Sequence, residues 1–185
     1  MSGLTESSET VTGLSKAYGI NMTVVVAYAN ENWCGMAFDS ASSDEDSIYV
    51  ASTPKAIIHA GNGIIGAAGS WRVINLLSKL KARKVSPDTI VSMLKEIKGE
   101  DDSIKDMEIL CAWPGRPLTI IQGDFAIIEM ESPYLAIGSG SPYSLGYLEG
   151  CEEIGPEELN YAVEVAVKYS PSVVGPVKNL YCGSK

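Results

Sequence analysis

The order in which strand-like and helix-like segments follow one another limits the fold of this chain more than any other feature. Strand patterns come first, followed by two amphipathic helix patterns, four further strand patterns, two more helices and a last strand. A sheet built from βαβ units would alternate strands with helices, whereas this order groups them. We therefore expect an α+β fold, a four-layer αββα sandwich in which two antiparallel sheets are flanked by helix pairs.

A first hairpin is expected near the start of the folded region. The strand-like runs 23–29 and 33–39 flank the polar segment 30–32. Two apolar runs around a short polar turn are typical of a β-hairpin. A hairpin centred on the middle of this turn would place Thr23 opposite Asp39.

A second hairpin is expected around Gly61-Asn62, between the runs KAIIHA and GIIGAAG. Glycine and asparagine tolerate the backbone angles of tight turns, and strand-like residues lie on both sides. This hairpin would place Lys55 beside the segment that ends at Gly69. Both hairpins therefore collect polar or conformationally special residues at one end of the sheets.

Apolar residues recur at helical spacing in the segments expected to cover the sheets. Ser86-Pro87 supplies a cap and a first-turn proline for one helix, and another is expected to begin at Ser141-Pro142. The last runs from Pro156 to about Lys168. The core-facing positions are Val73, Leu76, Leu77 and Leu80, then Ile90, Leu94 and Ile97, and finally Leu159, Ala162, Val163 and Ala166.

The charge balance argues against two classes of partner. The formal net charge is −9 and the isoelectric point is about 4.6. Affinity for nucleic acid or for anionic membranes comes largely from clustered Lys and Arg, so we expect neither partner. Residues 1–22 lack the basic start and long apolar stretch of a secretory signal, and no run is long enough to span a membrane. We therefore expect a cytoplasmic protein.

The cysteines and the single histidine do not form the sequence pattern of a metal site. Cys34, Cys111, Cys151 and Cys182 are scattered without a CxxC pair, and the only histidine is His59. This is a poor ligand set for zinc, and an apolar-flanked cysteine in such a chain is usually a small buried residue. A Ser-His-Asp or Cys-His site could use only His59, beside which the sequence offers no orienting partner. No metal and no cofactor are expected.

The chain divides into an N-terminal segment and one domain. Residues 1–22 are rich in Ser, Thr, Glu and Gly, which is typical of an arm or a propeptide, and residues 23–185 form a single domain. Thr23 follows Met22 at this boundary. Three interpretations of the boundary remain open: an interior strand start, a second translation start, or a cleavage point that exposes Thr23 as a new amino terminus.

A terminal Thr23 would allow catalysis without histidine. A threonine hydroxyl is a weak nucleophile unless a base removes its proton, and its own α-amine, with a pKa of about 7.7 to 8.0, can do so. The site also needs a lysine beside the hydroxyl, a carboxylate to hold the lysine, and a backbone N–H for the oxyanion. Thr23, Lys55, Asp39 and Gly69 supply these types. Taken singly, each also fits an ordinary strand end or turn.

The spacing of these residues resembles the proteasome β-subunit family of N-terminal nucleophile hydrolases, and in size its bacterial HslV branch. Asp39 lies sixteen residues after Thr23, Lys55 sixteen after Asp39, and Gly69 fourteen after Lys55, as in that family. A second match is the segment GSGSP at 138–142, whose counterpart in the family supports the active site through its serine, here Ser139. The resemblance covers residues 22 to 182.

The resemblance implies a threonine peptidase with Thr23, Asp39, Lys55, Gly69 and Ser139 in its catalytic machinery. It implies that Thr53, Ala67 and Trp71 line the pocket for the substrate side chain. It further implies homo-oligomeric rings or stacked rings that enclose the sites, unfolded proteins or peptides as substrates, and an ATP-dependent unfoldase as a partner. The fold that it implies is the same αββα sandwich.

Two features depart from the family pattern. The residue before the nucleophile is Met22, where self-processing members have glycine, and the segment after the last helix, 169–174, reads YSPSVV without the aspartate of the family. With Met22 attached, the nitrogen of Thr23 is an amide. Two alternatives to the peptidase therefore stay open: an inactive subunit that keeps residues 1–22 for assembly, and a small-molecule amidase on the same fold.

Overall fold

The structure is a computed structural model that describes residues 23–43, 48–50, 54–59, 63–80, 85–97 and 104–183. The expected arm or propeptide, residues 1–22, and the expected pocket residue Thr53 lie outside the described residues. None of the helices in the described ranges combines the length and the apolarity needed to cross a membrane.

Two antiparallel sheets form the centre of the molecule. The four-stranded sheet has the order β10-β1-β2-β11, and the five-stranded sheet has the order β5-β6-β7-β8-β9. The first consists of β1 (Val25–Ala29), β2 (Trp33–Asp39), β10 (Tyr134–Ile137) and β11 (Val177–Gly183). The second consists of β5 (Ala56–His59), β6 (Gly63–Ala68), β7 (Glu108–Ala112), β8 (Thr119–Gln122) and β9 (Ile127–Glu129).

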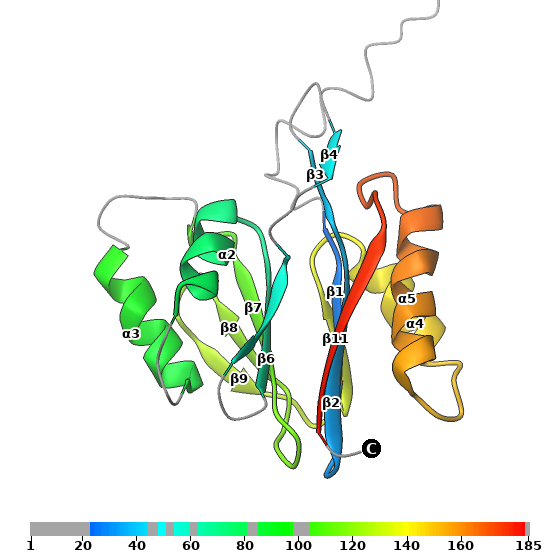
Figure 1. Cartoon of the computed structure of the whole chain (residues 1–185), viewed down its shortest axis with the longest axis horizontal. Helices are drawn as coiled ribbons and strands as arrows, with labels where there is room; N and C mark the ends of the chain where they lie inside the picture. Colours follow the sequence, from blue (N-terminus) through cyan, green and yellow to red (C-terminus); the bar gives the residue numbers. More distant parts are fainter. Residues whose placement is uncertain are drawn as a thin grey trace, which may run out of the picture.

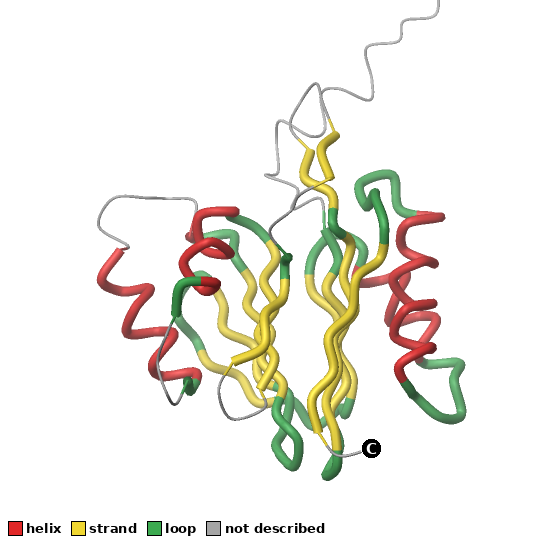
Figure 2. The backbone as a smooth tube through the Cα atoms, viewed as in Figure 1, coloured by secondary structure: helices red, strands yellow, loops and turns green. Residues whose placement is uncertain are grey.

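Helix pairs cover the outer faces of both sheets. Helices α2 (Trp71–Ser78) and α3 (Pro87–Ile97) lie against the five-stranded sheet, and α4 (Ser141–Leu148) and α5 (Pro156–Tyr169) lie against the four-stranded sheet (Figure 1). The same four layers can be followed from left to right in Figure 2, as helices, strands, strands and helices. The predicted αββα sandwich is therefore confirmed.

Three apolar clusters fill the spaces between the layers. The cluster between the two sheets includes Met36, Phe38 and Leu110, each at most 1% exposed. The sheets approach so closely that a side-chain carbon on Gly66 would lie 2.7 Å from Cγ1 of Val25. The other two clusters join each sheet to its helices. This packing holds the two sheets at a fixed separation, because interiors packed to crystal-like density resist small displacements.

The first hairpin differs by one residue from the predicted register. Val25 pairs with Phe38, so Val24 rather than Thr23 lies opposite Asp39, and the Asp39 N–H donates to the Val24 carbonyl at 3.3 Å. The reason is the turn, which has two residues between Asn30 and Trp33 and is closed by a 3.0 Å bond from the Asn30 N–H to the Trp33 carbonyl. The Asn30 side chain stabilises it by accepting bonds from the N–H groups of Asn32 and Trp33.

Two further differences from the sequence analysis concern local structure. Helix α2 ends at Ser78 and buries Val73, Ile74 and Leu77, so the expected Leu76 and Leu80 are only partly buried. Leu80 lies beyond the last turn of this helix. In addition, β3 (Ala41–Ser43) and β4 (Ile48–Val50) pair as a separate two-stranded sheet that the sequence did not indicate, and it projects beyond the sandwich (Figure 1).

Candidate active site

Three of the expected catalytic side chains meet at one end of the sheet sandwich. Thr23 lies two residues before the start of β1, Asp39 is the last residue of β2, and Lys55 directly precedes β5. The Thr23 hydroxyl donates to Asp39 Oδ1 at 2.8 Å, and Lys55 Nζ lies 2.9 and 2.8 Å from the two carboxylate oxygens. Lys55 Nζ also donates to Thr23 Oγ1. Each of the three side chains therefore contacts the other two.

The trio is buried, which sets its electrostatics. Thr23, Asp39 and Lys55 are 4%, 0% and 5% exposed. Burial lowers the pKa of Lys55 below its ordinary value, because loss of hydration disfavours the ammonium more than the Asp39 carboxylate stabilises it. A buried ion pair needs further hydrogen bonds to its charged oxygens. Asp39 Oδ1 accepts two such hydrogen bonds, from the Thr23 hydroxyl and from the Val24 N–H at 2.9 Å.

The loop after β10 holds the backbone of Thr23 on both sides. The Gly140 N–H donates to the Thr23 carbonyl at 3.1 Å, and the Thr23 N–H donates to Ser139 Oγ at 3.3 Å. Gly138 has a φ of 86°. A side-chain carbon there would lie 2.8 Å from Cγ2 of Thr23 and would also meet the Thr23 carbonyl oxygen. Glycine is therefore required at this position for two independent reasons.

Two serines extend the polar contacts of the loop and were not among the expected site residues. Ser172 donates to Ser139 Oγ at 2.9 Å, and the hydroxyls of Ser170 and Ser172 lie 3.0 Å apart. Both serines follow α5, in the segment that the sequence presented only as a departure from the family pattern. The signal available was Ser-x-Ser directly after a helix end, but its partner Ser139 is 33 residues away and no local pattern indicates that contact.

The remaining expected residues lie around β6 and the start of α2. Gly69 follows β6 with a φ of 107°, a backbone conformation that favours glycine. Ala67 pairs with Lys55 through a 2.9 Å bond from its N–H, and its side chain is buried in the cluster under α2 and α3. The Trp71 ring centre lies 6.0 Å from Lys55 Nζ. These positions put the beginning of α2 next to the charged group of the trio.

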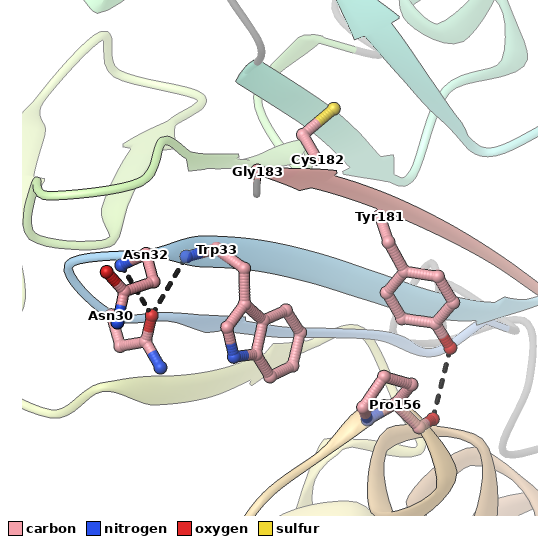
Figure 3. A pocket seen from close by; sticks show the side chains of 7 residues that line it. All are labelled: Asn30, Asn32, Trp33, Pro156, Tyr181, Cys182 and Gly183. Atoms are coloured by element: carbon pink, nitrogen blue, oxygen red, sulfur yellow. Dashed lines mark hydrogen bonds between the residues drawn. The ribbon is translucent and has the colours of Figure 1, made fainter. Parts of the chain in front are cut away.

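A cavity lies at the opposite end of β1 and β2. It has a volume of about 700 Å³ and is lined by residues of the β1–β2 turn, the end of β11 and the start of α5 (Figure 3). Its polar groups are engaged within the fold, since the Tyr181 hydroxyl donates to the Pro156 carbonyl at 3.0 Å. Burial raises the pKa of Cys182, which keeps this thiol protonated at neutral pH. The cavity offers no activated nucleophile comparable with Thr23.

The described residues contain no group of three or more His, Cys, Asp or Glu side chains placed to hold a metal ion. The chemistry of the trio is instead that of a hydroxyl beside a cation. A lysine ammonium that donates to a hydroxyl oxygen stabilises the alkoxide relative to the alcohol, and a nearby base can then remove the proton. The nitrogen of Thr23, 3.3 Å from Ser139 Oγ, is a candidate for this base once it is an amine.

Neither a family model nor a curated protein sequence matches the chain. Solved structures do. The Thiobacillus denitrificans BPH is 21% identical with a TM-score of 0.69, covering 88% of this chain and 99% of its own. The eukaryotic HslV from Trypanosoma brucei is 17% identical with a TM-score of 0.67, covering 88% and 100%. Anbu, an ancestral beta-subunit from Yersinia bercovieri, is 16% identical with a TM-score of 0.69, covering 87% and 82%. The chain therefore has the fold of the proteasome-like N-terminal nucleophile hydrolases.

Proposed function

We propose that this protein is a threonine peptidase of the proteasome and HslV family, active once Thr23 is the amino terminus. The observation that carries the proposal is the buried contact of Lys55 Nζ with both the Thr23 hydroxyl and the Asp39 carboxylate. Burying a lysine and a carboxylate costs free energy of desolvation. Next to a nucleophile, the same two groups favour its deprotonation. The spacing match to the family supports the same assignment.

In the proposed reaction, Thr23 Oγ1 attacks the carbonyl carbon of a peptide bond. The α-amine of Thr23 takes the hydroxyl proton and delivers it to the leaving amine, so that an ester links the acyl group to Thr23. The Gly69 N–H stabilises the oxyanion, and Lys55, held by Asp39, stabilises the developing alkoxide. Water then hydrolyses the ester with the same amine as base, which restores the free hydroxyl.

The surroundings of the site extend the proposal. By resemblance to the family, Ser139 orients the amine, and Thr53, Ala67 and Trp71 line the substrate pocket, Ala67 through its backbone because its side chain is buried. By resemblance to the family, copies of the chain form rings or stacked rings in the cytoplasm, with unfolded proteins as substrates and an ATP-dependent unfoldase as a partner. The likeness to an ancestral beta-subunit is consistent with such an assembly.

The test begins with the amino terminus. The chain is expressed without tags from its first residue and from Met22, and intact mass and terminal sequencing establish whether Thr23 is first. Each product is then incubated with epoxomicin, which is bound to the Thiobacillus denitrificans BPH in one structure. We expect an adduct on Thr23 only in the product that begins with Thr23, and none in its Thr23→Ala variant. A Thr23-terminal product that stays unlabelled and inactive on peptides contradicts the proposal.

A second candidate is a catalytically inactive assembly subunit that keeps residues 1–22. The observation in its favour is that the Thr23 nitrogen is an amide in the full chain and is already satisfied by Ser139. Under this candidate, a chain lacking residues 1–22 loses its oligomeric state in size-exclusion chromatography. Under the peptidase proposal, the same truncation leaves the oligomer intact and creates activity.

A further inference from the structure

One carboxylate outside the catalytic trio reaches from one sheet to the loop that holds the nucleophile. Glu108 is the first residue of β7 in the five-stranded sheet, and its Oε2 accepts a 3.1 Å hydrogen bond from the Gly138 N–H. Gly138 follows β10, which belongs to the four-stranded sheet. The bond is partly buried and joins residues 30 positions apart. It is therefore a polar link across the interface of the two sheets.

The loop that donates this bond is the one that positions Thr23. Its three consecutive residues, Gly138, Ser139 and Gly140, contact the carbonyl, the nitrogen and the side chain of Thr23. Ile137, directly before the loop, pairs with Val25 of β1. A shift of the loop would therefore move the nitrogen and the hydroxyl of the nucleophile with it.

The five-stranded sheet, whose Glu108 carboxylate accepts this bond, carries the other half of the proposed site. Glu108 pairs with Ala68 in the antiparallel ladder between β7 and β6, and Ala68 directly precedes Gly69, the proposed oxyanion donor. Thr23 and Asp39 belong to the four-stranded sheet, whereas Lys55 and Gly69 flank strands of the five-stranded sheet. The distance from nucleophile to oxyanion donor thus depends on how the two sheets are held at this end.

Polar side chains link the two sheets at this end. Lys55 contacts both Asp39 and Thr23, and Glu108 accepts the bond from the Gly138 N–H. The apolar contacts between the sheets fix their separation but are not directional. A hydrogen bond from a backbone N–H to an ionised carboxylate is both directional and stronger than a neutral one. It suits a role in fixing the sheets laterally.

We propose that Glu108 is a positioning residue, whose carboxylate fixes the loop 138–140 and with it Thr23 relative to Gly69. This role rests on the proposed peptidase function for its effect on rate. The link itself is a property of the fold. Displacements of about 1 Å between reacting groups can reduce rates by about 100-fold, so loss of this bond changes the rate of attack more than the binding of substrate.

The test uses the chain that begins at Thr23 and measures epoxomicin labelling of Thr23 by mass spectrometry at several concentrations. We expect Glu108→Ala to reduce the limiting labelling rate roughly 10-fold to 100-fold while the half-saturating concentration changes little. Glu108→Gln keeps an acceptor oxygen and is expected to fall between Glu108→Ala and the wild type. Glu129→Ala, an exposed carboxylate on β9 of the same sheet, is the control and should label as the wild type does.

A second readout separates this inference from the peptidase proposal. Hydrogen exchange of the peptide that contains Gly138 is followed in the same variants, and we expect it to be roughly tenfold faster in Glu108→Ala than in Glu129→Ala. If the wild type labels and Glu108→Ala labels equally fast, the positioning role is wrong. If the wild type itself does not label, the peptidase proposal fails, and unchanged exchange at Gly138 would then overturn the link as well. Glu108→Gln gives the same comparison if Glu108→Ala does not fold.

Discussion

The two ends of strands β1 and β2 are stabilised in different ways. At the end with Thr23, buried polar groups are bonded to partners far along the chain, since Lys55 is 32 residues from Thr23 and Ser139 is 116. At the other end, the Asn30 side chain and the N–H groups of the turn are bonded within four residues, and one long-range bond, from the Gly115 N–H to the Asn30 carbonyl at 2.8 Å, is added. Long-range bonds between buried groups form only when several elements are in place together. The first end therefore depends on the whole fold, and the second largely on its own sequence.

The sharpest test of this difference removes the charge partner at the first end. Lys55→Met leaves the buried Asp39 carboxylate without its counter-charge, and we expect a loss of about 3–5 kcal/mol in the free energy of unfolding. Asn30→Ala at the other end removes bonds of a local turn and is expected to lose about 1 kcal/mol. Urea unfolding of both variants measures the two values. Equal losses would mean that the two ends do not differ as described.

The loop that holds Thr23 offers a second comparison, between two glycines. Gly138→Ala places a side chain at a positive φ and against Thr23, and we expect a loss of roughly 2–3 kcal/mol. Gly146 lies inside α4 with nothing within 4 Å of an added side-chain carbon. Gly146→Ala is therefore expected to raise the free energy of unfolding by about 0.4–1 kcal/mol. In thermal unfolding, the melting temperature should fall for Gly138→Ala and rise for Gly146→Ala.

The pH dependence of stability gives a third test at the same end. Because burial lowers the pKa of folded Lys55, the unfolded chain binds this proton at pH values where the folded chain has released it. Stability conferred by this group therefore rises with pH between its lowered folded pKa and about 10.4, the ordinary value for lysine. In urea unfolding from pH 7 to pH 10, the free energy of unfolding of the wild type should rise relative to that of Lys55→Met. A constant difference between the two would show that the pKa is not lowered.

A smaller effect is expected for the serine behind the loop. Ser172→Ala removes the bond to Ser139 and is expected to lower the free energy of unfolding by about 1 kcal/mol. In a chain that begins at Thr23, it should also slow epoxomicin labelling less than Ser139→Ala does, because Ser139 contacts Thr23 directly. Labelling rates of the two single variants, measured side by side, decide the order. A larger effect of Ser172→Ala would indicate a direct role for this hydroxyl.

At the turn end of the sheet, two neighbouring cysteines are expected to differ in reactivity because they differ in burial. Cys34 of β2 and Cys182 of β11 are cross-strand partners. Cys34 is fully buried, and burial raises its pKa to about 12, whereas Cys182 is partly exposed. With iodoacetamide at pH 8, we expect slow modification of Cys182 and none of Cys34 in the folded protein, with both modified in urea. Peptide mass spectrometry measures each site.

The sequence indicated the layers of the fold and most of the elements because both depend on local patterns. The face of α5 illustrates this, since its four expected core residues Leu159, Ala162, Val163 and Ala166 are all fully buried. The hairpin register was wrong by one residue because it depends on the conformation of the turn, which the Asn30 side chain determines. The pairing of β3 with β4 gave no clear signal, as their strands have only three residues each.

The candidate site was predictable only where spacing repeats a known pattern. The meeting of Thr23, Asp39 and Lys55 follows from two hairpins whose ends lie on facing sheets. The contacts of Ser172 and Glu108 were not predicted, because each depends on how separate layers pack. Glu108 in particular is the first residue of an otherwise apolar strand, and nothing in its neighbourhood indicates that its carboxylate reaches a loop of the other sheet.

The full chain already has the lysine and the carboxylate against the Thr23 hydroxyl, and the serine against the Thr23 nitrogen, while Met22 is still joined to Thr23. Under the proposed function, conversion to the active form would break one covalent bond and add a charge to one nitrogen, beside contacts that already exist. Control over such an enzyme would lie in the timing of a single cleavage, and its onset of activity would show no delay for refolding.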